Sequence, residues 1–498
     1  MKYILAIDQG TTGSRAVIYD RRGRIVTSAY EEFRQYFPKP GWVEHDPEEI
    51  WRSVNSTIQK ALQKIDPRSI MAIGITNQRE TTVIWDRQTG RPVHPAIVWQ
   101  CRRTAARCEG LKSGKGNSRF FRERTGLPID AYFSATKIEW ILKNVRGAKK
   151  KAQDRKLCFG TTDSWILWKL TAGRSHATDY TNASRTMLFN INELKWDDQI
   201  LRKFGIPKKM LPEVKKSSGL FGRTVGIGRL PAGIPISGMA GDQQAALFGQ
   251  ACFEPGSIKN TYGTGAFVLM NAGKKKPSSK YGLIVTIACG SRGEPVYALE
   301  GAIFSAGSAM QWMRDGLGII GEASCSEKMA MALKDNGGVY FVPAFVGLGA
   351  PYWDQRARGA VFGITRCTKK EHLARAALEA MCYQTKDVLL AMQKDTGLKI
   401  KGLKVDGGAS ANNFLCGFQS DILGIEAIRP KVIEITSLGV AYLAGLALGY
   451  WKDSAEIKKC WRIDKVFRPK MKRNEAARLY KGWQNAVKRT LSTVNSTQ

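Results

Sequence analysis

Residues 4–15 read Ile4-Leu5-Ala6-Ile7-Asp8-Gln9-Gly10-Thr11-Thr12-Gly13-Ser14-Arg15, and a second apolar run, residues 16–19, follows at once. This pattern predicts a strand, a tight turn and a second strand. Glycines let backbone N–H groups approach an anion closely, and the hydroxyl groups and the arginine add donors and positive charge. The turn therefore favours phosphate binding, although Gly/Thr clusters are also typical of plain hairpin turns.

A single carboxylate, Asp8, stands at the end of the first predicted strand. It would repel a phosphate in the turn unless a cation lay between them. Magnesium is the natural bridge, because it binds carboxylates and phosphates together, directly or through water. We therefore expect Asp8 to help hold Mg²⁺.

Two further glycine turns occur in the second half of the chain. Residues 258–270 repeat the order of strand, Gly/Thr turn and strand, and residues 403–413 run from an apolar strand through Asp406 and two glycines into a predicted helix start. Free N–H groups at a helix start suit anions. Three such loops predict a nucleotide held between duplicated domains. No Walker sequence competes, because residues 114–116 (Gly-Lys-Gly) lack its spacing and its Ser/Thr.

The composition indicates a globular protein of more than one domain. With 498 residues and 43% apolar side chains, the chain can bury two cores. The N-terminus lacks the pattern of a signal peptide, and the longest apolar run, residues 435–451, is too short and too rich in glycine to span a membrane. We expect a cytoplasmic protein with a buried helix at 435–451 and a disordered end at 493–498.

Cysteine and histidine usage excludes several classes of enzyme. The ten cysteines form no C-x-x-C pair, which argues against zinc ribbons and disulfide scaffolds and favours reduced, mostly buried thiols. The four histidines have no metal-ligand spacing and none lies beside a G-x-S-x-G elbow. Zinc hydrolysis and histidine-based nucleophilic catalysis are therefore disfavoured.

The chain is strongly basic, with 77 Lys and Arg against 43 Asp and Glu and a net charge of +34. Such a field attracts anions. The basic residues are nevertheless spread in small groups, such as 149–151 and 274–276, without a recognisable nucleic-acid-binding motif. We expect a generally basic surface and no nucleic-acid partner, with faster capture of ATP that salt would weaken.

Strand and helix patterns alternate along the chain, which predicts an α/β fold with helices covering a sheet. The clearest predicted strands are 71–76 and 81–86, and the clearest helices are 138–144, 242–250, 371–392 and 475–491. Near residues 250–256 a predicted helix gives way to Pro255 and Gly256, which suit a hinge. The predicted domains are therefore 1–251 and 252–498.

Several longer segments of the sequence resemble segments of known proteins. Besides residues 8–15, they are NQRET (77–81), IVWQCRRT (97–104), YFSATK (132–137), TNASRTM (181–187), GDQQAALFGQ (241–250) and GAPYWD (349–354). The chain closely resembles glycerol kinases of the FGGY carbohydrate kinase family. The resemblance implies an α/β actin-like ATPase fold, with two ribonuclease-H-like domains of mixed five-stranded sheets flanking a deep cleft. It further implies ATP-dependent phosphorylation of glycerol to sn-glycerol 3-phosphate by a homodimer or homotetramer.

The same resemblance implies a set of glycerol-binding residues: Arg79, Glu80, Trp99, Tyr132, Asp242, Gln243 and Phe267. Read alone, the two isolated aromatics at 99 and 267 would be core residues, the tyrosine a half-buried strand residue, and the Arg-Glu pair surface charge. Asp242 is the expected general base, which takes the proton from the terminal hydroxyl of glycerol as that oxygen attacks the γ-phosphorus. An isolated Gly-Asp-Gln would instead be interpreted as a helix N-cap.

The nucleotide residues are carried over in the same way. They are Thr11, Thr12, Gly13, Ser14, Arg15, Thr264, Gly265, Gly307, Gln311, Gly408 and Asn412, with Asp8 and Asp242 positioning Mg²⁺. For Gly307 and Gln311 a plain helix terminus fits nearly as well. Glycerol is expected to draw the domains together about the hinge, which excludes water from the reaction.

Parts of the sequence bear on two other functions and two modes of control. A related FGGY kinase acting on xylulose or gluconate would share the ATP loops but would not need the expected glycerol-binding residues. The positive charge favours a non-catalytic nucleotide switch or polyanion-binding protein, whereas Asp242 and the substrate-binding segments disfavour it. Gly233 stands where relatives inhibited by fructose 1,6-bisphosphate place an arginine, and residues 200–240 contain no histidine for activation by phosphorylation. We expect neither control to operate.

Overall fold

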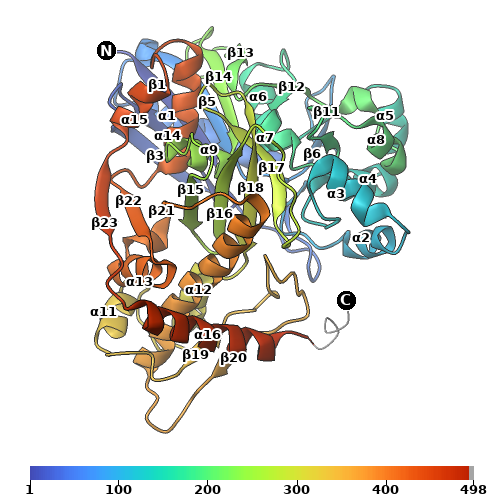
Figure 1. The fold of residues 1–498 in the computed structure, drawn as a ribbon. Helices are drawn as coiled ribbons and strands as arrows, with labels where there is room; N and C mark the ends of the chain where they lie inside the picture. The colour runs from blue at the N-terminus through green and yellow to red at the C-terminus, as the bar shows by residue number, and fades with distance from the viewer. Residues whose placement is uncertain (493–498) are drawn as a thin grey trace.

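The computed structural model describes residues 1–492 and contains two large mixed sheets (Figure 1). The disorder expected at 493–498 lies outside the described residues. The first sheet has six strands in the order β13-β14-β5-β1-β2-β3. Their bounds are β1 Tyr3–Gln9, β2 Gly13–Tyr19, β3 Ile25–Glu32, β5 Ile70–Asn77, β13 Ser218–Arg223 and β14 Pro235–Gly241. β1 is antiparallel to β2 and parallel to β5, so the predicted strand, turn and strand is a hairpin at the centre of the sheet.

The second sheet has seven strands in the order β17-β18-β16-β15-β21-β22-β23. They are β15 Ile258–Tyr262, β16 Ala266–Gly273, β17 Ile284–Cys289, β18 Pro295–Ile303, β21 Gly402–Asp406, β22 Glu426–Pro430 and β23 Ile463–Phe467. Its five central strands, β18-β16-β15-β21-β22, repeat the pairing directions of β3-β2-β1-β5-β14. The duplicated layout is therefore confirmed.

The expected count of five strands per sheet is wrong. β13 pairs antiparallel with β14, β17 with β18 and β23 with β22, each at the edge of the five-stranded core. An added antiparallel strand covers the unpaired N–H and C=O groups that an edge strand presents. Such a pairing is a long-range choice that local sequence patterns do not display.

Sixteen α-helices are described in residues 1–492. They are α1 Pro47–Leu62, α2 Ala105–Lys112, α3 Asn117–Thr125, α4 Ser134–Asn144, α5 Ala148–Gln153, α6 Thr162–Leu170, α7 Tyr180–Ala183, α8 Asp198–Phe204, α9 Asp242–Gly249, α10 Gly307–Gln311, α11 Cys325–Met331, α12 Lys370–Thr396, α13 Asn413–Leu423, α14 Ile435–Ala447, α15 Ser454–Cys460 and α16 Arg473–Thr490. The remaining short strands are β4 Glu44–His45, β6 Val83–Asp86, β7 Ala96–Ile97, β8 Leu157–Gly160, β9 Ala177–Asp179, β10 Phe189–Asn190, β11 Lys195–Trp196, β12 Glu213–Lys215, β19 Tyr340–Val342 and β20 Ala360–Phe362. Each strand and helix predicted above is present, with ends that differ by a few residues. The ten cysteines are free, and seven of them are buried, as expected.

The first sheet is covered on both faces. Alternate side chains of a strand point to opposite faces, so Leu5 and Ile7 pack with Val54 and Ile58 of α1, whereas Ile4 and Ala6 belong to the cluster that contains α14. α14 is the buried helix expected at 435–451, and it follows β22 of the second sheet in the chain (Figure 1). The second half of the chain thus supplies a helix to the first sheet.

Close approach of α14 depends on glycines. A Cβ at Gly74 of β5 would overlap the carbonyl oxygen of Val440, and a Cβ at Gly238 of β14 would lie 2.8 Å from the same oxygen. A Cβ at Gly439 would overlap the carbonyl of Ala245, where α14 crosses α9. α9 in turn packs against β15 and β16 of the second sheet. The two sheets are therefore joined through this crossing of α9 and α14.

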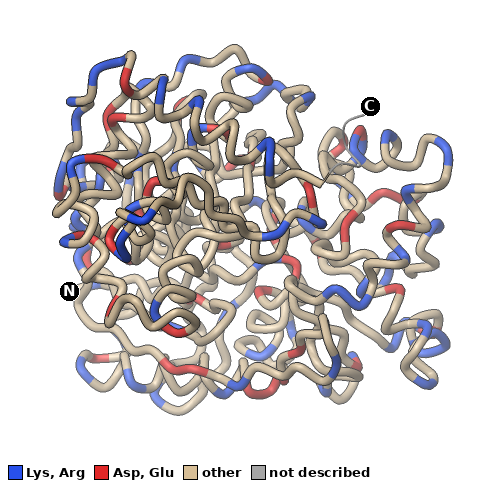
Figure 2. Tube along the Cα trace, turned by 90° about the horizontal axis from the view of Figure 1, so that it is seen from below, with Lys and Arg blue, Asp and Glu red and all other residues tan. Residues whose placement is uncertain are grey.

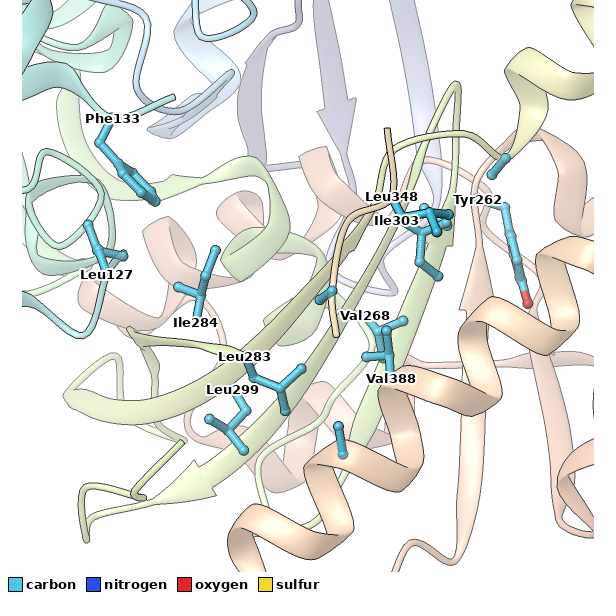
Figure 3. Packing of buried hydrophobic residues seen from close by; sticks show 14 of the residues in the cluster. Leu127, Phe133, Tyr262, Val268, Leu283, Ile284, Leu299, Ile303, Leu348 and Val388 are labelled. Atoms are coloured by element: carbon cyan, nitrogen blue, oxygen red, sulfur yellow. The ribbon is translucent and has the colours of Figure 1, made fainter. Parts of the chain in front are cut away.

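The segment that contains α2, α3, α4 and α5 forms a lobe that packs on β17 of the second sheet (Figures 1 and 3). Leu127 and Phe133 of this lobe share one continuous apolar cluster with Ile284. The Val285 N–H donates to the Gly126 carbonyl at 3.1 Å, and a Cβ at Gly126 would overlap the carbonyl of Val285. The lobe is thus fixed to the second sheet by both apolar and backbone contacts.

Lys and Arg residues are spread along the whole trace (Figure 2). This distribution agrees with the small scattered groups in the sequence. The absence of a nucleic-acid partner stays a prediction. Within residues 1–492, no helix combines the length and the apolar character needed to cross a bilayer.

His45 is a buried histidine whose hydrogen bonds require the neutral form of its imidazole ring. Its Nε2–H donates to Gln35 Oε1 at 2.6 Å, and its Nδ1 lies 3.3 Å from the amide nitrogen of Gln78, which donates to it. Burial lowers the pKa of His45 to about 4. A proton on Nδ1 would replace this acceptor by a donor facing another donor.

We expect His45 to make the fold sensitive to acid. The histidine titrates near 6.5 when unfolded, so its contribution is complete above that pH and is lost as pH falls toward 4, by up to about 3 kcal/mol. Chemical denaturation of wild type and His45→Gln from pH 7 to 4 gives the difference in their free energies of unfolding at each pH. The contributions of the other titrating groups cancel in this difference. A difference in unfolding free energy that does not change with pH would contradict the prediction.

Candidate functional site

Three parallel strands of the first sheet end at one edge. In the register of the sheet, Asp8 of β1 lies beside Thr76 of β5, and Thr76 lies beside Ala240 of β14. The residues that follow these strand ends are the 10–13 turn, the Arg79–Glu80 pair and Asp242. Parallel pairing therefore gathers three predicted segments, far apart in the chain, at a single edge.

Asp242 is the first residue of α9, and Gly241 is the N-cap. The N-cap alternative for Asp242 is therefore wrong. Its Oδ1 lies 3.1 Å from Arg79 Nε and accepts from the Gln243 N–H at 2.7 Å, while 32% of its side chain is exposed. Among the described residues, its second carboxylate oxygen, Oδ2, accepts no hydrogen bond. Asp242 is thus held in place and still has a free basic oxygen.

The Arg79–Glu80 pair is buried, with 3% and 1% of the whole residues exposed, so the surface-charge alternative is wrong. Glu80 has a φ of +64°, a left-handed conformation that costs free energy for a residue with a side chain. Its carbonyl oxygen accepts from Ser134 Oγ at 3.1 Å and from Lys137 Nζ at 3.2 Å. These bonds hold the strained backbone, which presents both side chains at the edge of the sheet.

Aromatic side chains form a wall next to this pair. The rings of Trp99 and Tyr132 pack edge to face with centroids 5.6 Å apart. Trp99 Nε1–H donates to Thr11 Oγ1 at 3.0 Å, which joins the wall to the glycine turn. Trp99, Tyr132 and Phe267 of β16 are all half-buried, so the two isolated aromatics are not core residues. The predicted polyol residues of the first domain are therefore brought together.

Gln243 connects α9 to the second sheet. Its Oε1 accepts from Lys259 Nζ at 2.5 Å, and Lys259 also donates to Thr261 Oγ1 at 2.7 Å and to the Phe267 carbonyl at 3.4 Å. Burial lowers the pKa of Lys259 to about 8, and the carboxylate of Asp406 partly offsets this effect. Of the two polar ends of the Gln243 amide, only the NH₂ group is free to face a ligand.

The turn after β1 retains fewer free side-chain donors than the sequence suggests. Thr12 is exposed, and the Thr11 hydroxyl oxygen accepts from Trp99 Nε1–H, which leaves the O–H of Thr11 available to donate. The Ser14 hydroxyl is buried against Ser53 at 2.8 Å, so the expectation that it adds a phosphate donor is corrected. Side chains alternate along β2, which turns Ser14 toward α1 and away from the open end of the turn.

Gly13 and Arg15 lie on the same face of β2. Each also contacts other parts of the protein, and is therefore not reserved for a ligand. A Cβ at Gly13 would lie 2.7 Å from the backbone carbonyl oxygen of Glu31 in β3, so this glycine is needed for strand packing. Arg15 forms an ion pair with Glu434, next to the start of α14, and lies over the Tyr30 ring. The positive charge of Arg15 is therefore shared with a carboxylate.

The two glycine turns of the second half, at 263–265 and 407–408, meet each other, and Gly307 joins them. The Gly263 N–H donates to Gly265 at 2.8 Å, as the Gly10 N–H does to Gly13 at 2.9 Å in the first domain. Gly307 N–H donates to the Gly263 carbonyl, and a Cβ at Gly407 would overlap the carbonyl of Tyr262. Thr264, Gly265, Gly307 and Gly408 thus cluster at the ends of β15 and β21.

Three predicted nucleotide residues stand at helix ends. Gln311 is the last residue of α10 and is exposed, and Gly307 is the first residue of the same helix. Both positions agree with the alternative that these residues are plain helix termini. Asn412 is the N-cap of α13, and its side-chain oxygen accepts from the Leu415 N–H at 2.9 Å. Within residues 1–492, no hydrogen bond joins the 10–13 turn to the glycine segments of the second half.

Asp8 has the character of a cation ligand. Burial, with the nearby carboxylates of Asp242 and Glu434, raises the pKa of Asp8 to about 7, and Arg15 only partly opposes this shift. A divalent cation would relieve the same repulsion, so the residues fit Mg²⁺. No cluster of three or more His, Cys, Asp or Glu in the described residues is arranged for a metal, so phosphate oxygens and water would complete its shell.

Sequence reasoning missed Arg185, Lys259 and Glu300. Arg185 lies in the quoted word 181–187 but received no role. Glu300 is a charge inside the otherwise apolar strand 295–303, and Lys259 is a charge in the mostly buried strand 258–262. A charged side chain in a buried strand must be paired with an opposite charge. The position of each charge within a strand pattern could therefore have marked these two residues.

Comparison with known proteins identifies the two halves. Residues 3–249 match the N-terminal domain, and residues 258–448 the C-terminal domain, of the FGGY family of carbohydrate kinases. The chain belongs to this family. The expected fold class, two actin-like ATPase domains, is therefore confirmed for this FGGY kinase.

Individual relatives cover the FGGY chain from end to end. It is 58% identical over 493 residues to glycerol kinase 2 of Thermotoga maritima, which covers 99% of both chains. It resembles the crystal structure of Plasmodium falciparum glycerol kinase with ADP at a TM-score of 0.92, with 38% identity and 99% of both chains covered. A xylulose kinase of Lactobacillus acidophilus shares the fold, with a TM-score of 0.88, 24% identity and coverage of 98% and 97%.

Proposed function

We propose that this FGGY kinase transfers the γ-phosphoryl group of ATP to a terminal hydroxyl of glycerol, giving sn-glycerol 3-phosphate and ADP. Full-length relatives named glycerol kinases support this assignment, one of them solved with ADP. The observation that carries it is the free oxygen of Asp242 next to Arg79, at a wall made by Trp99 and Tyr132.

In the proposed reaction, Asp242 accepts the proton of the terminal hydroxyl as its oxygen attacks the γ-phosphorus. The new O–P bond forms, the bond from phosphorus to the β–γ bridging oxygen breaks, and ADP leaves. Phosphoryl transfer depends mostly on positioning and charge neutralisation. Arg79, Glu80 and Gln243 would position the hydroxyls, and Trp99, Tyr132 and Phe267 would line the site.

Glycerol offers little binding energy of its own. Its six heavy atoms set a ceiling of about −9 kcal/mol, and a real value falls well short of it. Specificity must therefore come from hydroxyl groups paired with buried polar side chains, since a site left with unpaired polar groups rejects a wrong ligand strongly. The buried Arg79–Glu80 pair meets this requirement.

The nucleotide is proposed to lie along the glycine segments. Thr11, Thr12, Gly13 and Arg15 of the first domain and Thr264, Gly265 and Gly307 of the second would face the phosphates. Gly408, Asn412 and Gln311 would lie toward the adenosine, and Ser14 would contribute its backbone only. Asp8 and Asp242 would hold Mg²⁺, which neutralises phosphate charge when bound.

Three further assignments are proposed with the function. Residues 1–251 and 252–498 form the two domains, with the hinge at 250–256, and the boundaries of the family matches support this division. Glycerol draws these domains together and excludes water. The protein assembles as a cytoplasmic homodimer or homotetramer, which light scattering and cell fractionation would test.

A substrate panel tests the assignment. Purified protein with ATP and Mg²⁺ is offered glycerol, xylulose and gluconate, and ADP release is coupled to identification of the product. We expect the highest kcat/KM for glycerol and phosphate at a terminal oxygen. A higher kcat/KM for xylulose or gluconate would overturn the assignment, and turnover of none would support a non-catalytic switch.

Trp99 offers a test of the aromatic wall. Replacing it by Leu removes most of a half-buried ring, which we expect to raise the KM for glycerol about tenfold, equivalent to about 1.4 kcal/mol. The control is Trp140→Leu, which removes a half-buried ring that packs on Trp42 at 5.3 Å. Equal KM values for both variants would contradict the role of Trp99.

A further inference from the structure

Arg79 belongs to a network of four buried charged side chains. Arg79 donates to Glu300 through Nη1 at 2.5 Å and through Nη2 at 3.2 Å. Arg185 donates to the same Glu300 at 2.9 Å through Nη2 and to Glu80 at 2.6 Å through Nε. All four side chains are at most 2% exposed. Two guanidinium groups and two carboxylates therefore balance one another away from water.

Glu300 is the member contributed by the second sheet. It lies in β18, opposite Leu269 of β16 and Ile284 of β17. Arg79, Glu80 and Arg185 all belong to the first half of the chain. Burial would raise the pKa of the Glu300 carboxyl, but the guanidinium groups of Arg185 and Arg79 outweigh it and keep this pKa below its ordinary value. Glu300 is thus an anion that the first domain needs and the second domain supplies.

The contacts of Arg79 explain what Glu300 does. The two terminal nitrogens of Arg79 donate to Glu300, and Nη1 also donates to Gln244 Oε1 at 3.2 Å. This bidentate hold fixes the plane of the guanidinium, because the fork of arginine matches a carboxylate in one orientation. In that orientation Nε faces Asp242 at 3.1 Å. The position of Asp242 relative to Arg79 is therefore set from the second sheet.

We propose that Glu300 is a positioning residue for polyol recognition, with Arg185 as its partner, so that the Arg79–Glu80 pair is correctly arranged only when the second domain is docked. This inference rests on the proposed function of the Arg79–Glu80 site. Buried ion pairs contribute little net stability compared with apolar replacements, so a stabilising role alone would not account for this network.

The test is Glu300→Gln, which keeps the shape of the side chain and removes its charge. We expect kcat/KM for glycerol to fall about a hundredfold, mainly through a higher KM, while the KM for ATP changes less than about threefold. The matched control is Glu379→Gln in α12, another buried carboxylate of the second half that pairs with an arginine, Arg375, at 2.8 Å. This control is expected to leave the KM for glycerol unchanged.

A double variant separates positioning from stability. Glu300→Gln leaves an excess positive charge in the interior, and adding Arg185→Met restores neutrality. We expect the double variant to regain the thermal midpoint while the KM for glycerol stays high, and Glu300→Asp to recover part of the lost kcat/KM. Recovery of glycerol KM together with the midpoint would overturn the proposal, as would a wild-type KM in Glu300→Gln.

Failure of the proposal for Glu300 can be distinguished from failure of the proposed substrate, glycerol. If the wild type phosphorylates another polyol best, the same KM comparison is made with that polyol, and only the glycerol assignment fails. If no polyol is turned over, binding of glycerol to wild type and Glu300→Gln is compared by calorimetry. Equal heats and affinities for the two proteins would then overturn the proposal.

Discussion

Replacing Asp242 by Asn is expected to lower kcat for glycerol phosphorylation by about 10² to 10⁴, the range typical of a lost general base. The asparagine side chain would retain an oxygen for the Gln243 N–H but could not take the proton of the attacking hydroxyl. Because the contact with Arg79 is kept in part, the KM for glycerol is expected to change far less than kcat. Steady-state kinetics over a range of glycerol and ATP concentrations measures both.

The control for this variant is Asp198→Asn. Asp198 is also the first residue of a helix, α8, and 56% of its side chain is exposed. We expect the control to keep full activity and both proteins to keep their thermal midpoints, since neither carboxylate is buried. A wild-type kcat for Asp242→Asn would remove Asp242 from the mechanism.

Replacing Gly439 by Ala is expected to lower the free energy of unfolding by about 3 kcal/mol, at the upper end of the usual cost of overpacking. The new methyl group would overlap the carbonyl of Ala245 and lie 2.9 Å from the Gly249 nitrogen. These are backbone atoms of α9, which cannot move aside as a flexible side chain can. α14 would therefore have to lift away from α9. Denaturation by guanidinium chloride measures the loss.

Gly417 of α13 is a matched control, because it is also a helix glycine. A Cβ there would meet no atom within 4 Å. Gly417→Ala is expected to raise stability by up to about 1 kcal/mol, the difference in helix propensity between the two residues. If both substitutions changed stability by the same amount, close packing at the α9–α14 crossing would not be the cause.

The elements with a strong periodic pattern could be predicted from the sequence. The sequence predicts α12 as an amphipathic helix, α16 as a charged helix and β5 as an apolar strand, because burial of one face repeats at a fixed spacing. The edge strands β13 and β23 were not predicted. Their side chains carry a weak burial pattern, and their pairing is decided by contacts with distant strands.

The site was predictable where chemistry is local and was missed where it depends on long-range contact. The glycine turns and Asp242 stand out because backbone freedom and charge are visible in a short segment. Period-2 alternation along β2 would have turned Ser14 away from Arg15, so this error was avoidable. The pairing of Glu300 with Arg79 joins positions 221 residues apart, and no local pattern reveals it.

The placement of α14 has a consequence for synthesis on the ribosome. β14, the last strand of the first sheet, ends at Gly241, and the helix that covers that sheet begins at Ile435, 194 residues later (435 − 241). At a translation rate of about 5 to 20 residues per second, the nascent first half waits roughly 10 to 40 s with one apolar face bare. Chaperones that shield such surfaces would act in this interval, and the two halves of the chain mature together.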